Sequence, residues 1–224
     1  MLSELLSGSM DFSSVIIYIL SSLIVIFLTL PVHEYAHGWT AVKLGDPTPR
    51  YQGRLSFSPF AHIDYIGALC IILFGFGWAK PVQVNSFNFR NPKRDMAITA
   101  LAGPVSNIVM ATIALFISNA IMAFAPAVTV TFYVFAFFYF IAQINISLAV
   151  FNLIPIPPLD GSRLLSALLP DRIYYKIMRY ERYFFILLIG LLYLGVLDGV
   201  LNTLTGGLMT GISFITGLPF KFLG

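Results

Sequence analysis

Residues 31–37 read PVHEYAH, and they directly follow the apolar run SVIIYILSSLIVIFLTL at residues 14–30. The two together are long enough to cross the roughly 30 Å of hydrocarbon in a bilayer as one helix. Ionisable side chains at membrane depth are costly unless they have a partner. This stretch therefore predicts a compensating partner for His33, Glu34 and His37, and the rest of the chain must supply it.

The composition is that of an integral membrane protein. Of the 224 residues, 58% are hydrophobic and only 10% are charged, and the mean hydropathy is +0.86. Soluble domains carry roughly 25% charged residues. We therefore expect an all-α polytopic membrane protein, a bundle of about four to six transmembrane helices. The single cysteine, Cys70, excludes an internal disulfide. Residues 1–14 lack Lys and Arg, so we expect no cleavable signal peptide there.

Several apolar stretches are candidates for membrane helices. The run IGALCIILFGFGWA at 66–79 is short for a full span, which favours a re-entrant or buried segment. The glycine-rich stretch at 205–220 is compatible with a span, a re-entrant loop or an interfacial helix. The stretches long enough to span the bilayer are at about residues 14–44, 95–124, 128–153 and 183–201.

The placement of Lys and Arg predicts the topology. Residues 43–94 and 163–182 contain all of the 13 basic residues except Lys221. If 66–79 does not span, both stretches lie on one side of the membrane and the uncharged turn at 125–127 lies on the other. The positive-inside rule favours this arrangement. We therefore expect a multi-pass protein of the plasma membrane, with an outside amino terminus and the PVHEYAH motif toward the cytoplasm.

Two pieces of the first basic stretch alternate between polar and apolar residues. They are GRLSFSP at 53–59 and KPVQVNSFNF at 80–89. Period-two alternation predicts strands, so we expect a small membrane-associated β-hairpin or sheet beside the re-entrant segment. We expect residues 1–224 to form a single membrane-embedded domain, with a core of about residues 20–170 and accessory carboxy-terminal helices at 171–224.

His33, Glu34 and His37 form an H-E-x-x-H pattern. Residues four apart lie on one face of a helix, so the two imidazoles can share one tetrahedral Zn²⁺. Glu34 can act as general base on a water that the metal activates. The alternative is ordinary interhelical hydrogen bonding by the two histidines. Because ionisable residues within membrane helices are rare and usually functional, the metal site is favoured.

A catalytic zinc site usually has three protein ligands, and His62, Asp64 and Asp160 are candidates for the third. Asp160 lies in FNLIPIPPLDGSRLL at 151–165, where three prolines unwind a long apolar helix. Irregular backbone at membrane depth is tolerated only where it is buried or lines a cavity. The alternative role for Asp160 is to cap the helix that follows it. The position of Asp160 in the sequence favours neither the metal-ligand role nor the helix-capping role.

HEYAHGW at 33–39, followed later by NLIPIPPLDG at 152–161, resembles the site-2 protease family of intramembrane zinc metalloproteases, peptidase family M50. The likeness continues through GRLSFSPFAHID, GWAKPVQVN and ALAGPVSN, and it is to the compact prokaryotic form without a PDZ or CBS domain. The resemblance implies that His33, His37 and Asp160 bind Zn²⁺ and that Glu34 is the general base.

The resemblance also implies catalytic roles for Asn107 and Asn152, as donors to the substrate backbone or to a developing oxyanion. Their alternative role is interhelical hydrogen bonding. Gly103 is expected to allow close helix packing.

The implied activity is hydrolysis of peptide bonds in or near the transmembrane segments of other proteins, as in regulated intramembrane proteolysis. The implied partners are transmembrane substrates unwound near the cleavage site and the lipid bilayer, with no nucleic acid. The strand-like pieces are expected to offer an edge for the unwound chain. The alternative function is a membrane zinc carrier or sensor without protease activity, although a transporter usually has paired repeats, which we do not find.

Overall fold

The computed structural model describes residues 11–74 and 76–221, so the expectation for the amino-terminal segment falls largely outside the described residues. The described chain is helical with irregular connections. The elements are α2 (Phe12–Ile24), η1 (Val25–Thr29), α3 (Leu30–Leu44), α4 (Thr48–Tyr51), η2 (Pro59–Ala61), α5 (Tyr65–Phe74), η3 (Ser86–Asn88), α6 (Pro92–Phe124), α7 (Thr129–Asn152), α8 (Asp160–Leu168), α9 (Asp171–Arg179), α10 (Glu181–Tyr193) and α11 (Asp198–Lys221).

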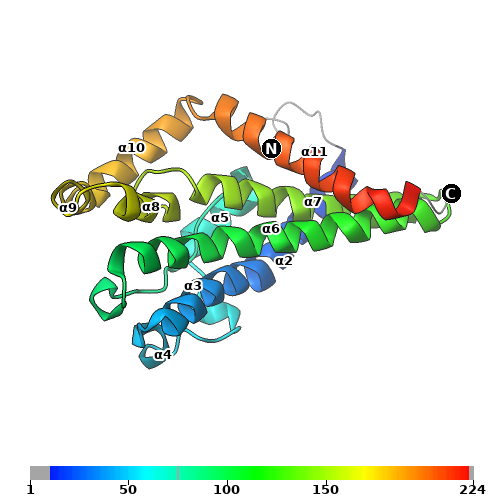
Figure 1. Ribbon diagram of the computed structural model, residues 1–224. Coiled ribbons are helices and arrows are strands. Elements are labelled where there is room, and N and C mark those ends of the chain that lie inside the picture. Colours follow the sequence, from blue (N-terminus) through cyan, green and yellow to red (C-terminus); the bar gives the residue numbers. More distant parts are fainter. Residues whose placement is uncertain (1–10, 75, 222–224) are drawn as a thin grey trace.

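Among the described residues, three helical segments are long and apolar enough to cross a membrane. The first is Phe12–Leu44, in which α2, the π-helical turn η1 and α3 follow one another without a gap. The other two are α6 and α7, which pack along each other, with α3 against α6 and α2 against α7 (Figure 1). These helices confirm the first three predicted membrane helices to within a few residues.

The fourth predicted helix, at 183–201, is wrong as one continuous span. The chain breaks between α10 and α11, which meet at 81° and pass the length and hydropathy test only as a bent pair. Gly195 has φ 68°, and Val196 N–H bonds to the Leu191 carbonyl at 3.1 Å. This left-handed glycine ends α10 as a Schellman-type cap. The glycine-rich stretch 205–220 lies within α11, which packs on α6 and α7.

The predicted β-hairpin is also wrong, because the described residues contain no strand. Both pieces are irregular, and they are joined mainly through a side chain instead of a backbone ladder. The Arg54 guanidinium donates to the carbonyls of Lys80 and Pro81 at 2.9 and 2.8 Å. Pro81 has no N–H to donate, and the Lys80 and Pro81 carbonyls accept from Arg54, so these two residues form no backbone ladder with residues 53–59.

The segment 66–79 enters and returns on one side of the bundle, as a re-entrant segment would. The helix α5 has only ten residues. Lys80 N–H then bonds to the His62 carbonyl at 2.8 Å, which places the two ends side by side. Gly67 permits the return, because a Cβ there would lie 2.8 Å from the backbone carbonyl carbon of Trp78.

The two ends of the bundle differ in charge. Both basic stretches lie at the end formed by the carboxy terminus of α3, by α4 and by α8 and α9, whereas the turn at 125–127 lies at the opposite end (Figure 1). Large hydrophobic side chains are exposed along the outer faces of the helices, as lipid contact requires. Examples are Ile16, Leu20, Phe27, Val105, Val109, Ile113, Phe116, Val130, Val134 and Ile215.

Candidate metal centre

The helix α3 places His33 and His37 one turn apart on its buried face. Their side chains are almost completely buried, with 4% and 7% of each residue exposed. The helix α3 continues directly from the π-helical turn η1, and Pro31, which has no N–H to donate into that turn, is its second residue. Its end is set by Gly45, which has φ 114°.

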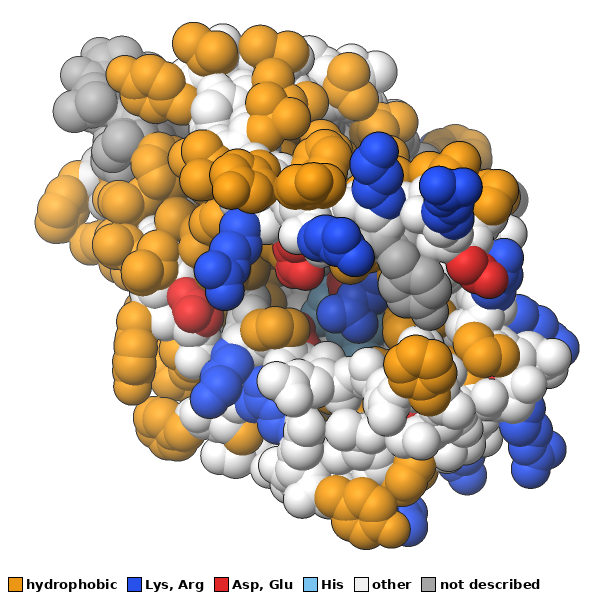
Figure 2. Space-filling model, turned by 90° about the vertical axis from the view of Figure 1, so that its left-hand side faces the viewer, with side chains coloured by type: hydrophobic (Ala, Val, Ile, Leu, Met, Phe, Trp, Pro, Cys, Tyr) orange, Lys and Arg blue, Asp and Glu red, His pale blue; other side chains and the backbone are white. Residues whose placement is uncertain are grey.

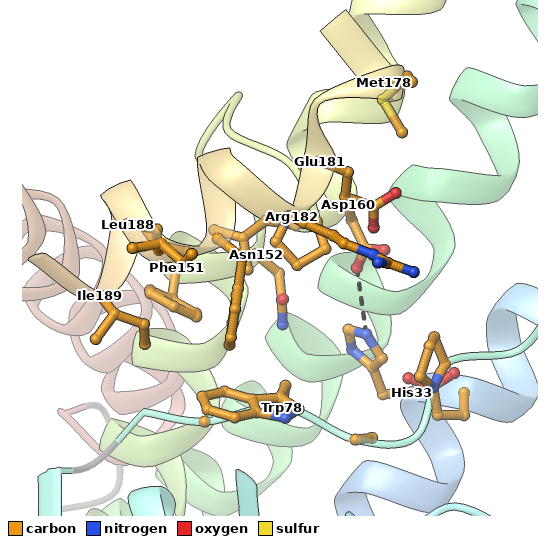
Figure 3. A pocket seen from close by; sticks show the side chains of 18 of the residues that line it. His33, Trp78, Phe151, Asn152, Asp160, Met178, Glu181, Arg182, Leu188 and Ile189 are labelled. Carbon is orange, nitrogen blue, oxygen red and sulfur yellow. Dashed lines mark ion pairs between the residues drawn. The ribbon is translucent and has the colours of Figure 1, made fainter.

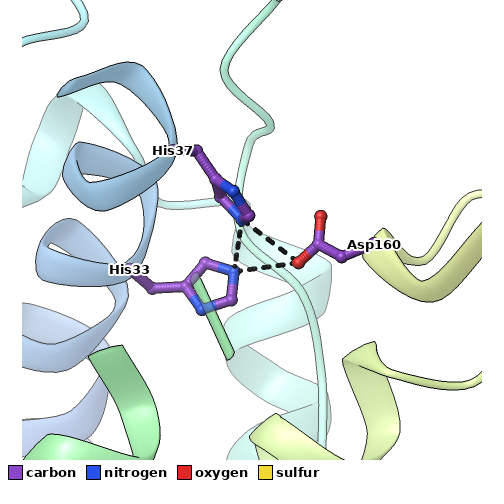
Figure 4. A group of neighbouring side chains, drawn as sticks. All are labelled: His33, His37 and Asp160. Carbon is purple, nitrogen blue, oxygen red and sulfur yellow. Dashed lines mark hydrogen bonds and ion pairs between the residues drawn. The ribbon is translucent and has the colours of Figure 1, made fainter. Parts of the chain in front are cut away.

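Three ligand atoms converge at this site (Figure 4). His33 Nε2 and His37 Nε2 are 3.1 Å apart. Asp160 Oδ2 lies 3.3 Å from the first and 3.1 Å from the second. Ligands about 2.0–2.1 Å from a tetrahedral zinc would be about 3.3 Å from each other. The spacing is therefore that of a zinc ligand set, and among the described residues no other group of His, Cys, Asp and Glu is packed in this way.

The hydrogen bond on the far side of His37 orients that ring. Its Nδ1 lies 2.7 Å from the Thr99 backbone carbonyl oxygen, which can only accept. The proton of a neutral His37 ring is therefore on Nδ1, and the Nε2 lone pair faces His33 and Asp160. A second bond of this kind is the usual support of a metal-binding histidine.

Asp160 reaches the histidines from the first turn of α8. The segment before it, which contains Pro155, Pro157 and Pro158, is non-helical, as the sequence predicts. The cap position of α8 is Leu159, and no side chain caps this helix end. The alternative role of Asp160 as a cap is thus not seen.

Gly103 on α6 leaves the space that the imidazoles occupy. A Cβ at this position would lie 2.6 Å from His33 Nε2 and would also collide with His37. Gly103 thus allows α6 to lie close to α3, and the groups that it contacts there are the imidazole rings of His33 and His37.

Glu34 lies beside the three ligand atoms and is 6% exposed. Its Oε2 accepts a hydrogen bond from the backbone N–H of Val82 at 2.9 Å. The carboxylate is thereby attached to the irregular segment that follows α5. The sequence gives no signal for this contact, because a backbone N–H is present at nearly every position.

A cavity of about 800 Å³ opens over this site. His33, Glu34 and Asp160 form part of its wall, and Asn152 and residues of α10 form other parts (Figure 3). Figure 2 shows Lys and Arg side chains gathered around a recess at whose base a histidine is visible. The site is therefore buried among helices yet open at the basic end of the bundle.

The two predicted catalytic asparagines occupy different surroundings. Asn152, the last residue of α7, lines the cavity. Asn107 is fully buried on α6, does not line the cavity, and neither its side-chain oxygen nor its nitrogen has a hydrogen-bond partner among the described residues.

The other candidates for a third ligand lie outside the metal group. His62 is fully buried, and its Nε2 bonds to the Ser56 carbonyl at 2.8 Å. Asp64 Oδ1 accepts the N–H groups of Ile66 and Gly67 at 3.1 and 2.9 Å, which caps α5.

Asp46 is a supporting residue that the sequence reasoning missed. It is fully buried and accepts hydrogen bonds from Asn85 N–H and Asn88 Nδ2, both at 2.7 Å. Burial raises the pKa of this carboxyl, but the bonds from Asn88, Thr48 and Asn85 outweigh it and hold the pKa below its usual value. The sequence Gly-Asp-Pro-Thr signals the local turn with Thr48, whereas the long-range bonds have no sequence signal.

Comparison with known proteins places these features in a family. The chain matches peptidase family M50 over residues 21–195. It is 39% identical over 171 residues to YwhC of Bacillus subtilis, a protein provisionally named a zinc metalloprotease, covering 75% of this chain and 77% of that one.

More distant relatives share the same provisional description. The chain is 30% identical to Rip2 of Mycolicibacterium smegmatis over 139 residues and to Rip2 of Mycobacterium tuberculosis over 140 residues. These matches cover 60% of this chain and 51% of each relative, so the chain spans about half the length of the Rip2 proteins. No solved structure matches the chain significantly. From the family match and the likeness to YwhC, the chain belongs to peptidase family M50 and is a zinc metalloprotease of the intramembrane, site-2 type.

Proposed function

We propose that this protein hydrolyses peptide bonds in or near the transmembrane segments of other membrane proteins, and that His33, His37 and Asp160 hold its zinc. The observation that carries the proposal is the convergence of two imidazole nitrogens and one carboxylate oxygen within 3.3 Å of one another. His33 and Asp160 lie in the wall of a cavity that is also lined by the carboxylate of Glu34.

Bound at these ligands, zinc would supply Lewis-acid chemistry, acidifying water and polarising a peptide carbonyl. Glu34 would take the proton of the attacking water and pass it to the leaving amine. Its bond to Val82 N–H holds one carboxylate oxygen, Oε2, so the other remains available for the proton. Neither step requires Glu34 to bind the metal.

The asparagines would complete the site. Asn152 lines the cavity, so its amide can donate to a substrate carbonyl or to the developing oxyanion. We propose a catalytic role for Asn107 as well, supported by its buried amide, which no described residue satisfies.

The substrate would have to unwind, because the carbonyls of a helical peptide are already bonded within the helix. Trp78, Ala79 and Pro81 line the cavity on the segment that leads to Val82. This segment forms no strand ladder within the protein. The backbone groups of Trp78 and Ala79 form no hydrogen bond within the described chain, so an extended substrate chain could lie along this part of the segment and bond to them, which is the usual mode of strand addition.

We further propose that the cavity opens toward the cytoplasm of a multi-pass plasma-membrane protein, and that the whole chain forms one protease domain. Support comes from the basic residues at the cavity end of the bundle and the uncharged turn at the other end.

The test is one assay on detergent-purified protein that measures zinc content and cleavage of model transmembrane substrates. Glu34→Gln is expected to retain zinc and lose cleavage, whereas His33→Ala and Asp160→Ala lose both. A chelator such as 1,10-phenanthroline should abolish wild-type cleavage, and added zinc should restore it. Full proteolysis by zinc-loaded Glu34→Gln would refute the role of Glu34. Zinc flux into liposomes without any peptidase activity would favour a carrier.

A further inference from the structure

The cavity has one wall whose chemistry the proposed reaction does not use. We propose that Arg182, supported by Arg179, recognises an acidic side chain of the substrate close to the scissile bond, so that the favoured substrates are apolar segments with an acidic residue at one end. This inference rests on the proposed function, because it assigns the substrate class of the same site.

The first argument is the pattern of side chains along α10. Arg182, Phe185, Ile186 and Ile189 all line the cavity. Their spacing of three, four and seven residues places them on one face of the helix. The face therefore begins with a charge in the first turn and continues as an apolar stripe. A binding wall of this composition matches a peptide with the same order of residues.

The second argument is that the two cations have no partner within the protein. Arg179 and Arg182 are exposed and line the cavity. Neither side chain forms an ion pair or hydrogen bond with a residue of the described chain. Among the described residues, only one Lys or Arg forms an ion pair with a carboxylate. It is Lys93, which pairs with Asp171. Glu181 also lines the cavity beside Arg182, but it forms no ion pair with either arginine, so the guanidinium groups are available to a ligand.

The third argument is the direction in which the Arg182 side chain points. Figure 3 shows Arg182 extending from α10 toward the part of the cavity where His33 and Asp160 lie. The wall that carries Arg182 is held in place by Phe185, whose ring packs edge-on against Trp78 with centroids 5.5 Å apart. Trp78 belongs to the segment proposed to bind the substrate backbone. A chain lying along that segment would pass in front of Arg182.

The spacing along α10 gives the expected register. At about 1.5 Å per residue, Arg182 and Ile189 are separated by about 10 Å along the helix axis. An extended chain covers that distance in about three residues. We therefore expect the acidic residue about three positions from the apolar side chain that contacts Ile189.

A lipid headgroup is the competing occupant, since basic residues at a membrane surface attract anionic lipids. The lining favours a peptide, because the same cavity continues past the arginines to Glu34 and to the proposed zinc ligands His33 and Asp160. A headgroup phosphate bound to the arginines would leave this inner part of the cavity unfilled.

The test measures binding, so that it does not depend on turnover. Full-length, zinc-loaded Glu34→Gln protein in neutral detergent is titrated with fluorescently labelled apolar peptides of about 20 residues. Each peptide carries one Asp at a scanned position, and a matched peptide carries Asn there. At one position or two adjacent ones, the Asp peptide is expected to bind about fivefold more tightly than the Asn peptide. High salt should reduce this ratio.

Charge reversal identifies the residue responsible. Adding Arg182→Glu is expected to abolish the Asp preference and to favour a Lys peptide at the same position. Arg172→Glu is the matched control, because Arg172 is exposed on α9 but does not line the cavity. Retained zinc shows that each variant is folded, and Arg182→Gln, which removes the charge without reversing it, should give a ratio near unity.

The outcomes separate this inference from the proposed function. An Asp-to-Asn ratio near unity at every position, or a ratio that Arg182→Glu leaves unchanged, overturns the inference even if the wild type cleaves the peptides. So does an effect of Arg182→Glu confined to binding of phosphatidylglycerol vesicles. An Arg182-dependent preference without wild-type cleavage supports the inference and refutes the proposed proteolysis.

Discussion

The Glu34 carboxylate accepts a hydrogen bond from the backbone N–H of Val82, with Oε2 and N 2.9 Å apart. The proposed general base is therefore attached to the segment proposed to bind the substrate. This bond links the segment to the Glu34 carboxylate directly and does not involve the proposed metal ligands.

Val82→Pro removes this N–H at a position outside any regular element, where a proline can be accommodated, and it also replaces a buried side chain. We expect zinc to remain bound and kcat/KM to fall about 10- to 100-fold, since the carboxylate is no longer held in place. The measurement is cleavage of a model substrate with zinc content determined in parallel. Val84→Pro is the control, because no hydrogen bond of its N–H is found in the described structure. Equal loss in both variants would contradict the coupling.

Gly103→Ala should weaken zinc binding. The added Cβ would lie 2.6 Å from His33 Nε2 and would also collide with His37, so the two rings must separate. We expect at least about a tenfold loss of zinc affinity, in the range found when the support of a metal ligand is removed. Competition with a chromogenic chelator measures the affinity. Gly206→Ala on α11 is the control, because nothing lies within 4 Å of a Cβ at that position. Unchanged affinity in Gly103→Ala would mean that the rings are not held as described.

Asp46→Asn should lower stability at neutral pH but not in acid. The pKa of the native carboxyl lies below the ordinary value of 3.8, so its stabilising contribution is complete above the unfolded pKa. That contribution is lost as the pH falls through the native pKa. We expect the variant to be about 2 kcal/mol less stable at neutral pH. The difference from the wild type should shrink below about pH 4.

Thermal unfolding in detergent across this pH range measures the effect of Asp46→Asn. Asp171→Asn serves as the comparison, because Asp171 forms an exposed ion pair with Lys93 that contributes little. A stability difference independent of pH would show that the Asp46 charge is not what its partners stabilise.

His62→Ala should destabilise the protein and leave zinc binding intact. The buried ring fills space, and its Nε2 donates to the Ser56 carbonyl at 2.8 Å. Losing both costs about 2–4 kcal/mol, which should appear as a lower melting temperature. Zinc stoichiometry measured below that temperature should stay at the wild-type value. Loss of zinc from the folded variant would restore His62 as a candidate ligand.

The features that the sequence predicts best are those formed by residue types with few possible structural roles. Long apolar runs gave the helices that became α3, α6 and α7. The pair His33 and His37, spaced by one helical turn, was enough to predict a metal site. Spacing alone did not choose Asp160 as the third ligand, because that choice depends on how the unwound segment before α8 is placed beside α3.

The errors have a common physical origin. The alternation around Arg54 suggested strands because it counts side chains and ignores where backbone carbonyls find their donors. The break at Gly195 was missed because the residues on either side are apolar, and hydropathy does not detect a left-handed turn. Asp46 and Val82 support the site through partners about 40 to 50 residues away in the chain, and no local pattern records such contacts.

The length of α6 sets the depth at which the proposed metal centre would lie in a bilayer. The part of this helix between Gly103 and Phe124 is about 32 Å long, close to the thickness of the hydrocarbon layer. With Phe124 at one surface, the proposed metal centre beside Gly103 would lie near the opposite one. A substrate helix entering alongside would be cut close to that surface, leaving one fragment of about 20 residues, still long enough to stay in the bilayer. The other fragment would keep little apolar chain and be free to diffuse away, so a single cut would turn a membrane-anchored protein into a soluble one.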